Sequence, residues 1–131
     1  MKAPGHPRAV ILCIDDQETA LRLRRRVLER AGYKVLTATR AHKALEIFRK
    51  NHVDLVLTEH VLPAIIGQTA VAATLKMLRP EVPVAIYSAD LAEPEDMRFA
   101  DIFITKLVSV DELLRTIEGL LLKGARTVAA A

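Results

Sequence analysis

The stretch Val10-Ile-Leu-Cys-Ile-Asp-Asp16 joins an uninterrupted apolar run to two adjacent carboxylates. A short apolar run of this kind, rich in β-branched residues, is typical of a strand that is covered on both faces of a sheet. The two acidic residues stand directly after the carboxyl end of that strand. In open parallel sheets, ligands bind outside this end of the strands. The stretch therefore predicts both a buried parallel strand and a functional edge of the sheet.

Four further runs of the same kind follow along the chain. We expect strands at residues 35–36, 53–57, 82–87 and 102–104, in addition to 10–14. The segments between them have helical spacing, and helices are expected at residues 17–31, around 44–48, at 68–78 and at 109–123. This alternation favours a doubly wound α/β fold, with a five-stranded parallel sheet and helices on both faces. Residues 88–101 fit the pattern poorly, because they leave room for only a short helix and contain Pro94.

The helices also carry signals for their buried faces and their ends. In the first helix we expect an apolar stripe that faces the core and a basic face that points outward. The stripe comprises Ala20, Leu23, Val27, Leu28 and Ala31, and the basic face comprises Arg22, Arg25, Arg26 and Arg30. Gly32 supplies a stop signal for this helix. Ser109 followed by Glu112 is a capping box, which predicts the start of the last helix.

Composition limits the class of protein. The 131 residues, of which 51% are hydrophobic and 27% charged, suit a single domain over 1–131, with a core at about 8–123 and a short disordered tail at 124–131. A net charge of +3 and 4% aromatic residues disfavour a nucleic-acid partner. The lone Cys13 excludes an internal disulfide, and no apolar run is long enough to span a bilayer. We therefore expect a cytoplasmic protein that has no membrane partner.

Five polar side chains are expected to meet at the carboxyl edge of the predicted sheet. They follow the first, third, fourth and fifth strands and are Asp15, Asp16, Glu59, Ser88 and Lys106. Converging carboxylates can hold a hard divalent cation such as Mg²⁺, while an ammonium group and a hydroxyl can contact phosphoryl oxygens. Each residue alone has a simpler explanation, such as a helix cap or a solvated strand end. Together they indicate phosphoryl-transfer chemistry.

Several motifs occur here in the order and spacing of a known family. They are Ile14-Asp-Asp16, Asp54-Leu-Val-Leu-Thr-Glu-His-Val-Leu-Pro63, Gly67, Tyr87-Ser-Ala89 and Ile104-Thr-Lys106. With these motifs the chain resembles the receiver domain of bacterial two-component response regulators, over about residues 8–123. The resemblance implies a flavodoxin-like fold in which the strands of the sheet follow the order 2-1-3-4-5.

The resemblance also implies roles for individual residues. Asp15 and Asp16 match the acidic pair that holds Mg²⁺ in such domains, and the backbone carbonyl of Val61 matches a further metal ligand. Ser88 matches the hydroxyl residue that follows the phosphoryl group when the domain switches. Lys106 matches the lysine that pairs with that group. Weakly bound Mg²⁺ is the cofactor that these matches imply.

Glu59 departs from the family pattern, because it stands where receiver domains place the aspartate that accepts the phosphoryl group. The extra methylene moves the carboxylate by about 1.5 Å, and a misplacement of about 1 Å can slow an in-line displacement roughly a hundredfold. We therefore expect impaired phosphorylation. Glu59 either mimics the activated state permanently, by reaching toward Ser88 and Lys106, or only pairs with Lys106 in an inert scaffold. Slow phosphorylation of Glu59 is a third alternative.

Two further features bear on how such a domain would pass on a signal. Leu107 stands where receiver domains usually have a proline, commonly with a cis bond, and a trans bond is expected here. The segment before the last strand is several residues shorter than the family norm and contains Pro94. Phe103, in contrast, matches the family's aromatic residue that swings between exposed and buried positions.

The leading hypothesis is a stand-alone, atypical receiver in phosphorelay signalling that acts by protein–protein contact and is not an enzyme. Its expected partners are a histidine kinase, another signalling protein or a second copy of the chain in a homodimer. No output domain is expected after Lys123. The alternative is a small Mg²⁺-dependent phosphohydrolase that uses Asp15 as its nucleophile, with Asp16 or Glu59 as a metal ligand.

Overall fold

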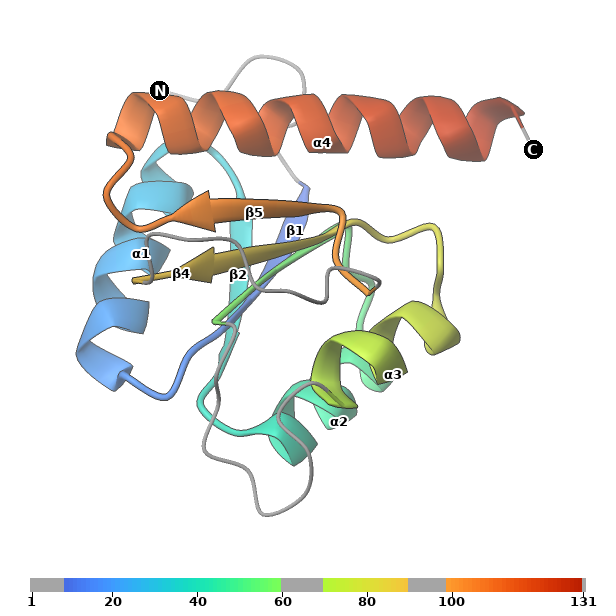
Figure 1. Ribbon diagram of the computed structural model, residues 1–131, viewed down its shortest axis with the longest axis horizontal. Helices are drawn as coiled ribbons and strands as arrows, with labels where there is room; N and C mark the ends of the chain where they lie inside the picture. The colour runs from blue at the N-terminus through green and yellow to red at the C-terminus, as the bar shows by residue number, and fades with distance from the viewer. Residues whose placement is uncertain (1–8, 60–69, 90–98, 131) are drawn as a thin grey trace.

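The computed structural model describes residues 9–59, 70–89 and 99–130 of the chain (Figure 1). The strands are β1 (Val10–Ile14), β2 (Lys34–Ala38), β3 (Leu55–Thr58), β4 (Val84–Ser88) and β5 (Ile102–Thr105). The helices are α1 (Glu18–Arg30), α2 (Ala41–Lys50), α3 (Ala70–Leu78) and α4 (Val110–Ala130). Among the described residues, no helix combines the length and the apolar character that a membrane crossing requires.

The strands form one parallel sheet in the order β2-β1-β3-β4-β5. This confirms the predicted doubly wound, flavodoxin-like sheet. The hydrogen-bonded ladders continue one residue past the ends of the strands. The N–H of Glu59 donates to the carbonyl of Ile14 at 2.9 Å, and the N–H of Lys106 donates to the carbonyl of Ser88 at 2.7 Å. The backbone therefore anchors Glu59 and Lys106 at the same edge of the sheet.

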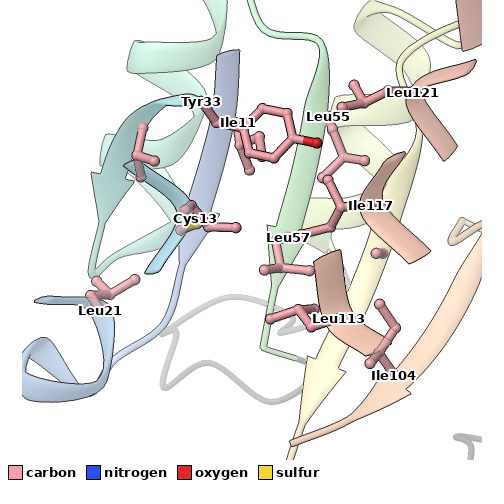
Figure 2. Packing of buried hydrophobic residues seen from close by; sticks show 13 residues of the cluster. Ile11, Cys13, Leu21, Tyr33, Leu55, Leu57, Ile104, Leu113, Ile117 and Leu121 are labelled. Atoms are coloured by element: carbon pink, nitrogen blue, oxygen red, sulfur yellow. The ribbon is translucent and has the colours of Figure 1, made fainter. Parts of the chain in front are cut away.

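Helices cover both faces of the sheet, with α1 and α4 on one face and α2 and α3 on the other (Figure 1). Figure 2 shows the core under α1 and α4, where three residues of α4 point toward β3 and β5. These residues are Leu113, Ile117 and Leu121, spaced one helical turn apart. Every residue of β1 and of β3 is buried, as expected for strands covered from both sides.

The buried face of α1 agrees with the predicted stripe only in part, since Leu28 is buried as predicted but Leu23 is not. Leu23, predicted to face inward, is 61% exposed, whereas Leu21 is 3% and Arg24 is 7% exposed. The buried positions are Leu21, Arg24 and Leu28, which share one helical face. Because α1 carries leucines on more than one face, apolar periodicity alone permits either orientation. Arg24 turns inward because Asp15 at the end of β1 pairs with its guanidinium. The predicted basic face is exposed at all four of its positions, which are Arg22, Arg25, Arg26 and Arg30.

The predicted signals at two helix ends are confirmed. Gly32 follows α1 with φ of 102°, a conformation that side chains with a Cβ rarely adopt. The next N–H, of Tyr33, donates back to the carbonyl of Leu28 at 3.1 Å and satisfies one of the last carbonyls of α1. At the start of α4, Ser109 Oγ accepts the N–H of Glu112 at 3.1 Å, which is the cap that the sequence predicts.

Several element boundaries differ from the sequence prediction, among them those of β2 and β3, and some predicted segments lie outside the described residues. α4 continues to Ala130, through most of the segment that was expected as a disordered tail, because the alanine-rich end has a high helix propensity. β4 begins at Val84 rather than at residue 82, since Pro83 has no N–H to contribute to the ladder. The predicted start of the third helix, at residues 68–69, and most of the poorly fitting segment, including Pro94, lie outside the described residues.

Candidate functional site

Asp15 is a buried carboxylate at the carboxyl end of β1. Its Oδ1 accepts the N–H of Gln17 at 2.9 Å, in the turn that leads into α1. Its Oδ2 accepts hydrogen bonds from Lys106 Nζ at 2.7 Å and from Arg24 Nη2 at 3.2 Å. This single carboxylate therefore ties together the end of β1, the middle of α1 and the residue that follows β5.

Lys106 connects Asp15 to Glu59. Its Nζ lies 3.4 Å from Glu59 Oε1, a longer contact than the 2.7 Å to Asp15 Oδ2. Both contacts are partly shielded from solvent, since the side chains of Lys106 and Glu59 are 21% and 16% exposed. An ammonium group has three donors and can serve two carboxylates at once. The three residues therefore form one ion-pair network at the edge of the sheet.

Arg24 extends this network from the side of α1. Its guanidinium is 3.2 Å from Asp15 Oδ2, and both side chains are almost fully buried, at 6% and 1% exposure. The guanidinium carbon also lies 4.7 Å from the centre of the Tyr87 ring on β4. A planar guanidinium can stack on an aromatic face while its N–H groups bind a carboxylate. Lys106 Nζ lies 5.8 Å from the same ring, so Tyr87 supports both cations.

The charges around Asp15 set its protonation state. Burial by itself raises the pKa of this carboxyl, because it disfavours the charged form. The hydrogen bonds from Lys106 and from the N–H of Gln17, with the positive charges of Lys106 and Arg24, outweigh burial and hold the pKa below its ordinary value. Asp15 is therefore a carboxylate at neutral pH, as both of its ion pairs require.

Of the remaining predicted site residues, those that the structure describes are not part of the ion-pair network of Asp15, Glu59 and Lys106. Asp16 follows Asp15 but is exposed. Ser88 ends β4 and is buried, opposite Thr105 in the register of β4 and β5. Phe103, the predicted switch aromatic, is half-buried on β5. The backbone carbonyl of Val61, predicted as a metal ligand, lies outside the described residues.

Leu107 follows Lys106 through a trans peptide bond and is exposed. The trans bond agrees with the expectation for a non-proline residue at this position. The N–H of Leu107 donates to Thr105 Oγ1 at 3.3 Å. The local turn after β5 therefore carries Lys106 toward Asp15 without a proline.

The described side chains do not fit the divalent cation that the receiver resemblance implies. Mg²⁺ is held by oxygen ligands in near-octahedral geometry. Both oxygens of Asp15 already accept hydrogen bonds, and two of those bonds come from cations. Within residues 9–59, 70–89 and 99–130, no group of three or more His, Cys, Asp or Glu side chains is arranged to hold a metal ion. In this arrangement Asp15, one of the two carboxylates that match the acidic pair of the family, is committed to Arg24 and Lys106.

Arg24 is the site residue that the sequence prediction missed. An arginine in a basic helix is ordinarily assigned to the solvated face. A signal was nevertheless present, because Leu21, Arg24 and Leu28 share one helical face and Arg24 interrupts an otherwise apolar stripe. An arginine within an inward stripe, on the helix that follows an acidic strand end, indicates a buried ion pair.

Comparisons with known proteins agree with this fold and with the order of the motifs. The family model of the response regulator receiver domain matches residues 11–118. "Autoinducer 1 sensor kinase/phosphatase LuxN" from Vibrio campbellii is 33% identical over 85 residues, which cover 65% of this chain and 10% of LuxN. This chain therefore corresponds to only a small part of LuxN.

Two proteins of similar length also match. "Polar-differentiation response regulator DivK" from Brucella ovis is 25% identical over 120 residues, covering 85% of this chain and 94% of DivK. The crystal structure of a CheY-like response regulator receiver domain protein from Methanospirillum hungatei has a TM-score of 0.82 and 27% identity, and the match covers 91% of this chain and 98% of that one. With the sheet order and the family match over residues 11–118, these findings show that the chain belongs to the response regulator receiver domain family of two-component signalling.

Proposed function

We propose that this receiver signals by protein–protein contact and that its phosphorylation step is impaired, because Glu59 replaces the acceptor aspartate. Its partner is a histidine kinase, another signalling protein or a second copy of the chain, and the site acts in the cytoplasm without turnover of a substrate. The observation that carries the proposal is the contact between Glu59 Oε1 and Lys106 Nζ, at 3.4 Å.

The backbone of Glu59 is held in place and cannot shift away from the site to compensate for the longer side chain. Its N–H is bound to the carbonyl of Ile14 at 2.9 Å, in line with the ladder between β1 and β3. The additional methylene therefore carries the carboxylate about 1.5 Å further from the sheet edge. Attack on a phosphoryl donor requires the nucleophile, phosphorus and leaving group to be in line, and a misplacement of about 1 Å can slow such a step roughly a hundredfold.

The longer arm also occupies Lys106. In the proposed mechanism, Glu59 gives Lys106 a permanent negative partner in place of one that comes and goes with phosphorylation. A carboxylate supplies one negative charge, whereas a phosphoryl group supplies about two, so Glu59 imitates the modified state only in part. The surface that partners contact is then held in one state by Lys106 and its two carboxylates.

The relatives support the class of partner. LuxN is named as a sensor kinase/phosphatase and DivK as a response regulator. A receiver related to both is expected to dock on a kinase or on its phosphotransfer domain. Docking and phosphorylation are separable, because binding uses the surface of the fold and phosphoryl transfer uses one carboxylate.

The contacts of Asp15 argue against the phosphohydrolase alternative. A nucleophilic carboxylate needs an accessible oxygen with a lone pair directed at phosphorus. The side chain of Asp15 is 1% exposed, and both of its oxygens accept hydrogen bonds. A group held in this way stabilises its neighbours and is a poor nucleophile.

The proposal is tested by incubating the protein with acetyl phosphate, or with a histidine kinase and ATP, in the presence of Mg²⁺ and measuring its intact mass. Glu59→Asp is compared with the wild type, and both are repeated with Arg24→Met, which releases one cation from Asp15. We expect no mass gain in the wild type or in Arg24→Met, and a gain of one phosphoryl group in at least one variant that carries Glu59→Asp.

Two results would contradict the proposal. A stoichiometric acyl phosphate on Glu59 of the wild type would show that the longer side chain reacts. Unlabelled Glu59→Asp in both backgrounds would show that Glu59 is not what impairs phosphorylation. Glu59→Gln serves as the control, because it keeps the length of the side chain but cannot form an acyl phosphate.

A further inference from the structure

We propose that the guanidinium of Arg24 is the built-in cation of this acidic site and takes the place of the divalent metal ion. The folded site is then complete without Mg²⁺. This inference goes beyond the proposed function, since it holds whether or not Glu59 accepts a phosphoryl group.

The first support is the way in which Arg24 is held. Its Cα lies in the second turn of α1, on the face that also buries Leu21 and Leu28. Its guanidinium pairs with Asp15 Oδ2 at 3.2 Å and stacks over Tyr87 at 4.7 Å. With a side-chain exposure of 6%, it has little room to move into solvent. The cation is thus fixed from both sides.

The second support is the charge balance at the sheet edge. The carboxylates of Asp15, Asp16 and Glu59 bring three negative charges, and Lys106 brings one positive charge. Without Arg24, two negative charges remain, which is the charge that one divalent cation neutralises. With Arg24, the net charge of these residues is one negative charge. Because the guanidinium is buried, dissolved salt screens its charge poorly. A metal ion that approached Asp15 would therefore meet less attraction and a fixed positive charge.

The third support is the competition for ligand oxygens. Oδ1 of Asp15 is bound to the N–H of Gln17, and Oδ2 is shared by Arg24 and Lys106. A metal ion that took Oδ2 would displace both cations from it. Lys106 could still pair with Glu59, but Arg24 would keep a buried charge with its carboxylate partner withdrawn. A buried charge that loses its partner is strongly unfavourable.

The inference is tested by calorimetric titration of MgCl₂ and MnCl₂ into metal-free protein at constant ionic strength. Arg24→Met removes the guanidinium but keeps an unbranched apolar side chain, and we expect it to bind both metals at least about tenfold more tightly than the wild type. Arg24→Lys keeps the charge and is expected to bind as weakly as the wild type. Arg25→Met is the matched control, because Arg25 is an exposed neighbour on α1 that pairs with Glu29.

Equal metal affinities of the wild type and Arg24→Met would overturn the inference, as would an equal gain in Arg25→Met. A second measurement needs no variant. The thermal midpoint of the wild type is expected to be the same in MgCl₂ and in NaCl of equal ionic strength, and a clear rise in MgCl₂ would overturn the inference even if Arg24→Met did not fold. Because neither readout involves phosphorylation, either proposal can fail without the other.

Discussion

Asp15 carries a buried negative charge. Whether its removal raises or lowers the free energy of unfolding shows which kind of site surrounds it. In a pocket of carboxylates that repel one another, replacing one by an amide relieves repulsion and stabilises the fold. Here Asp15→Asn instead leaves the Arg24 guanidinium buried without a counter-ion. We expect a loss of about 3–5 kcal/mol in the free energy of unfolding, measured by urea denaturation followed by circular dichroism.

Asp16→Asn is the matched control for this prediction. Asp16 is exposed, and its replacement should change the free energy of unfolding by less than about 0.5 kcal/mol.

The pKa of Asp15 lies below its ordinary value, so the stabilising effect of its charge is complete above about pH 4 and is lost as the pH falls through the folded-state pKa. Asp15→Asn should therefore weaken the acid dependence of stability. An Asp15→Asn variant as stable as the wild type would contradict the ion-pair account.

Cys13 tests the burial of β1 directly. Burial raises the pKa of its thiol to about 12, with a smaller opposing effect from Arg24 and a supporting one from Asp15. Since the thiolate is the reactive form, we expect the folded protein to react with an aromatic disulfide reagent far more slowly than the protein in denaturant at mildly alkaline pH. The release of the coloured thiol measures both rates. Similar rates would mean that β1 opens readily.

At the level of elements, the end of α1 depends on one unusual backbone conformation, at Gly32. Gly32 has φ of 102°, so Gly32→Ala should lower the free energy of unfolding by about 1–2 kcal/mol. Gly119 provides the control, because it lies within α4 and a Cβ placed there meets no atom within 4 Å. Gly119→Ala should raise stability by about 0.5–1 kcal/mol. Thermal or urea denaturation measures both, and a loss in Gly119→Ala would contradict the open environment of this position.

Elements also differ in how readily their sequence predicts them. β1 was predicted at its observed bounds because five consecutive apolar residues end at a carboxylate pair. The start of α4 was predicted because its cap lies within four residues of sequence. The outward basic face of α1 and the burial of Leu28 were predicted correctly, but Leu23 was wrongly placed in the core. The choice between Leu21 and Leu23 depends on the partner of Arg24.

At the scale of the whole molecule, the sheet separates two hydrophobic cores. Ile14 belongs to the core under α2 and α3, and Ile117 belongs to the core under α4. Both side chains are fully buried. Each isoleucine-to-valine replacement should cost about 0.5–1.5 kcal/mol, and the double variant should equal the sum within about 0.5 kcal/mol because the sheet lies between the two sites.

The contrasting pair lies within one core. Ile11 and Ile117 belong to the same cluster (Figure 2), so Ile11→Val combined with Ile117→Val is the pair in which a departure from additivity is expected. Urea denaturation of each single variant and of both double variants measures the difference. Strong coupling between Ile14 and Ile117, with none between Ile11 and Ile117, would contradict the division into two cores.

The amino-acid sequence is sufficient to predict the class of fold and the edge of the sheet at which the site lies. Strand and helix are decided by side-chain spacing over a few residues, and polar residues placed directly after parallel strands must share one edge of the sheet. The position of Glu59 after β3 and of Lys106 after β5 followed from this local information.

The ion pairs of Asp15, in contrast, depend on the three-dimensional fold and not on local sequence. Lys106 and Asp15 are 91 positions apart in the chain, and their 2.7 Å contact depends on how β5 is placed relative to β1. Arg24 faces inward because a buried carboxylate and an aromatic ring meet it there, and neither partner lies next to it in sequence. The periodicity of the sequence predicts which face of a helix or strand is apolar. The energy of a buried charge depends instead on the charged and polar groups within a few ångströms of it in the folded protein.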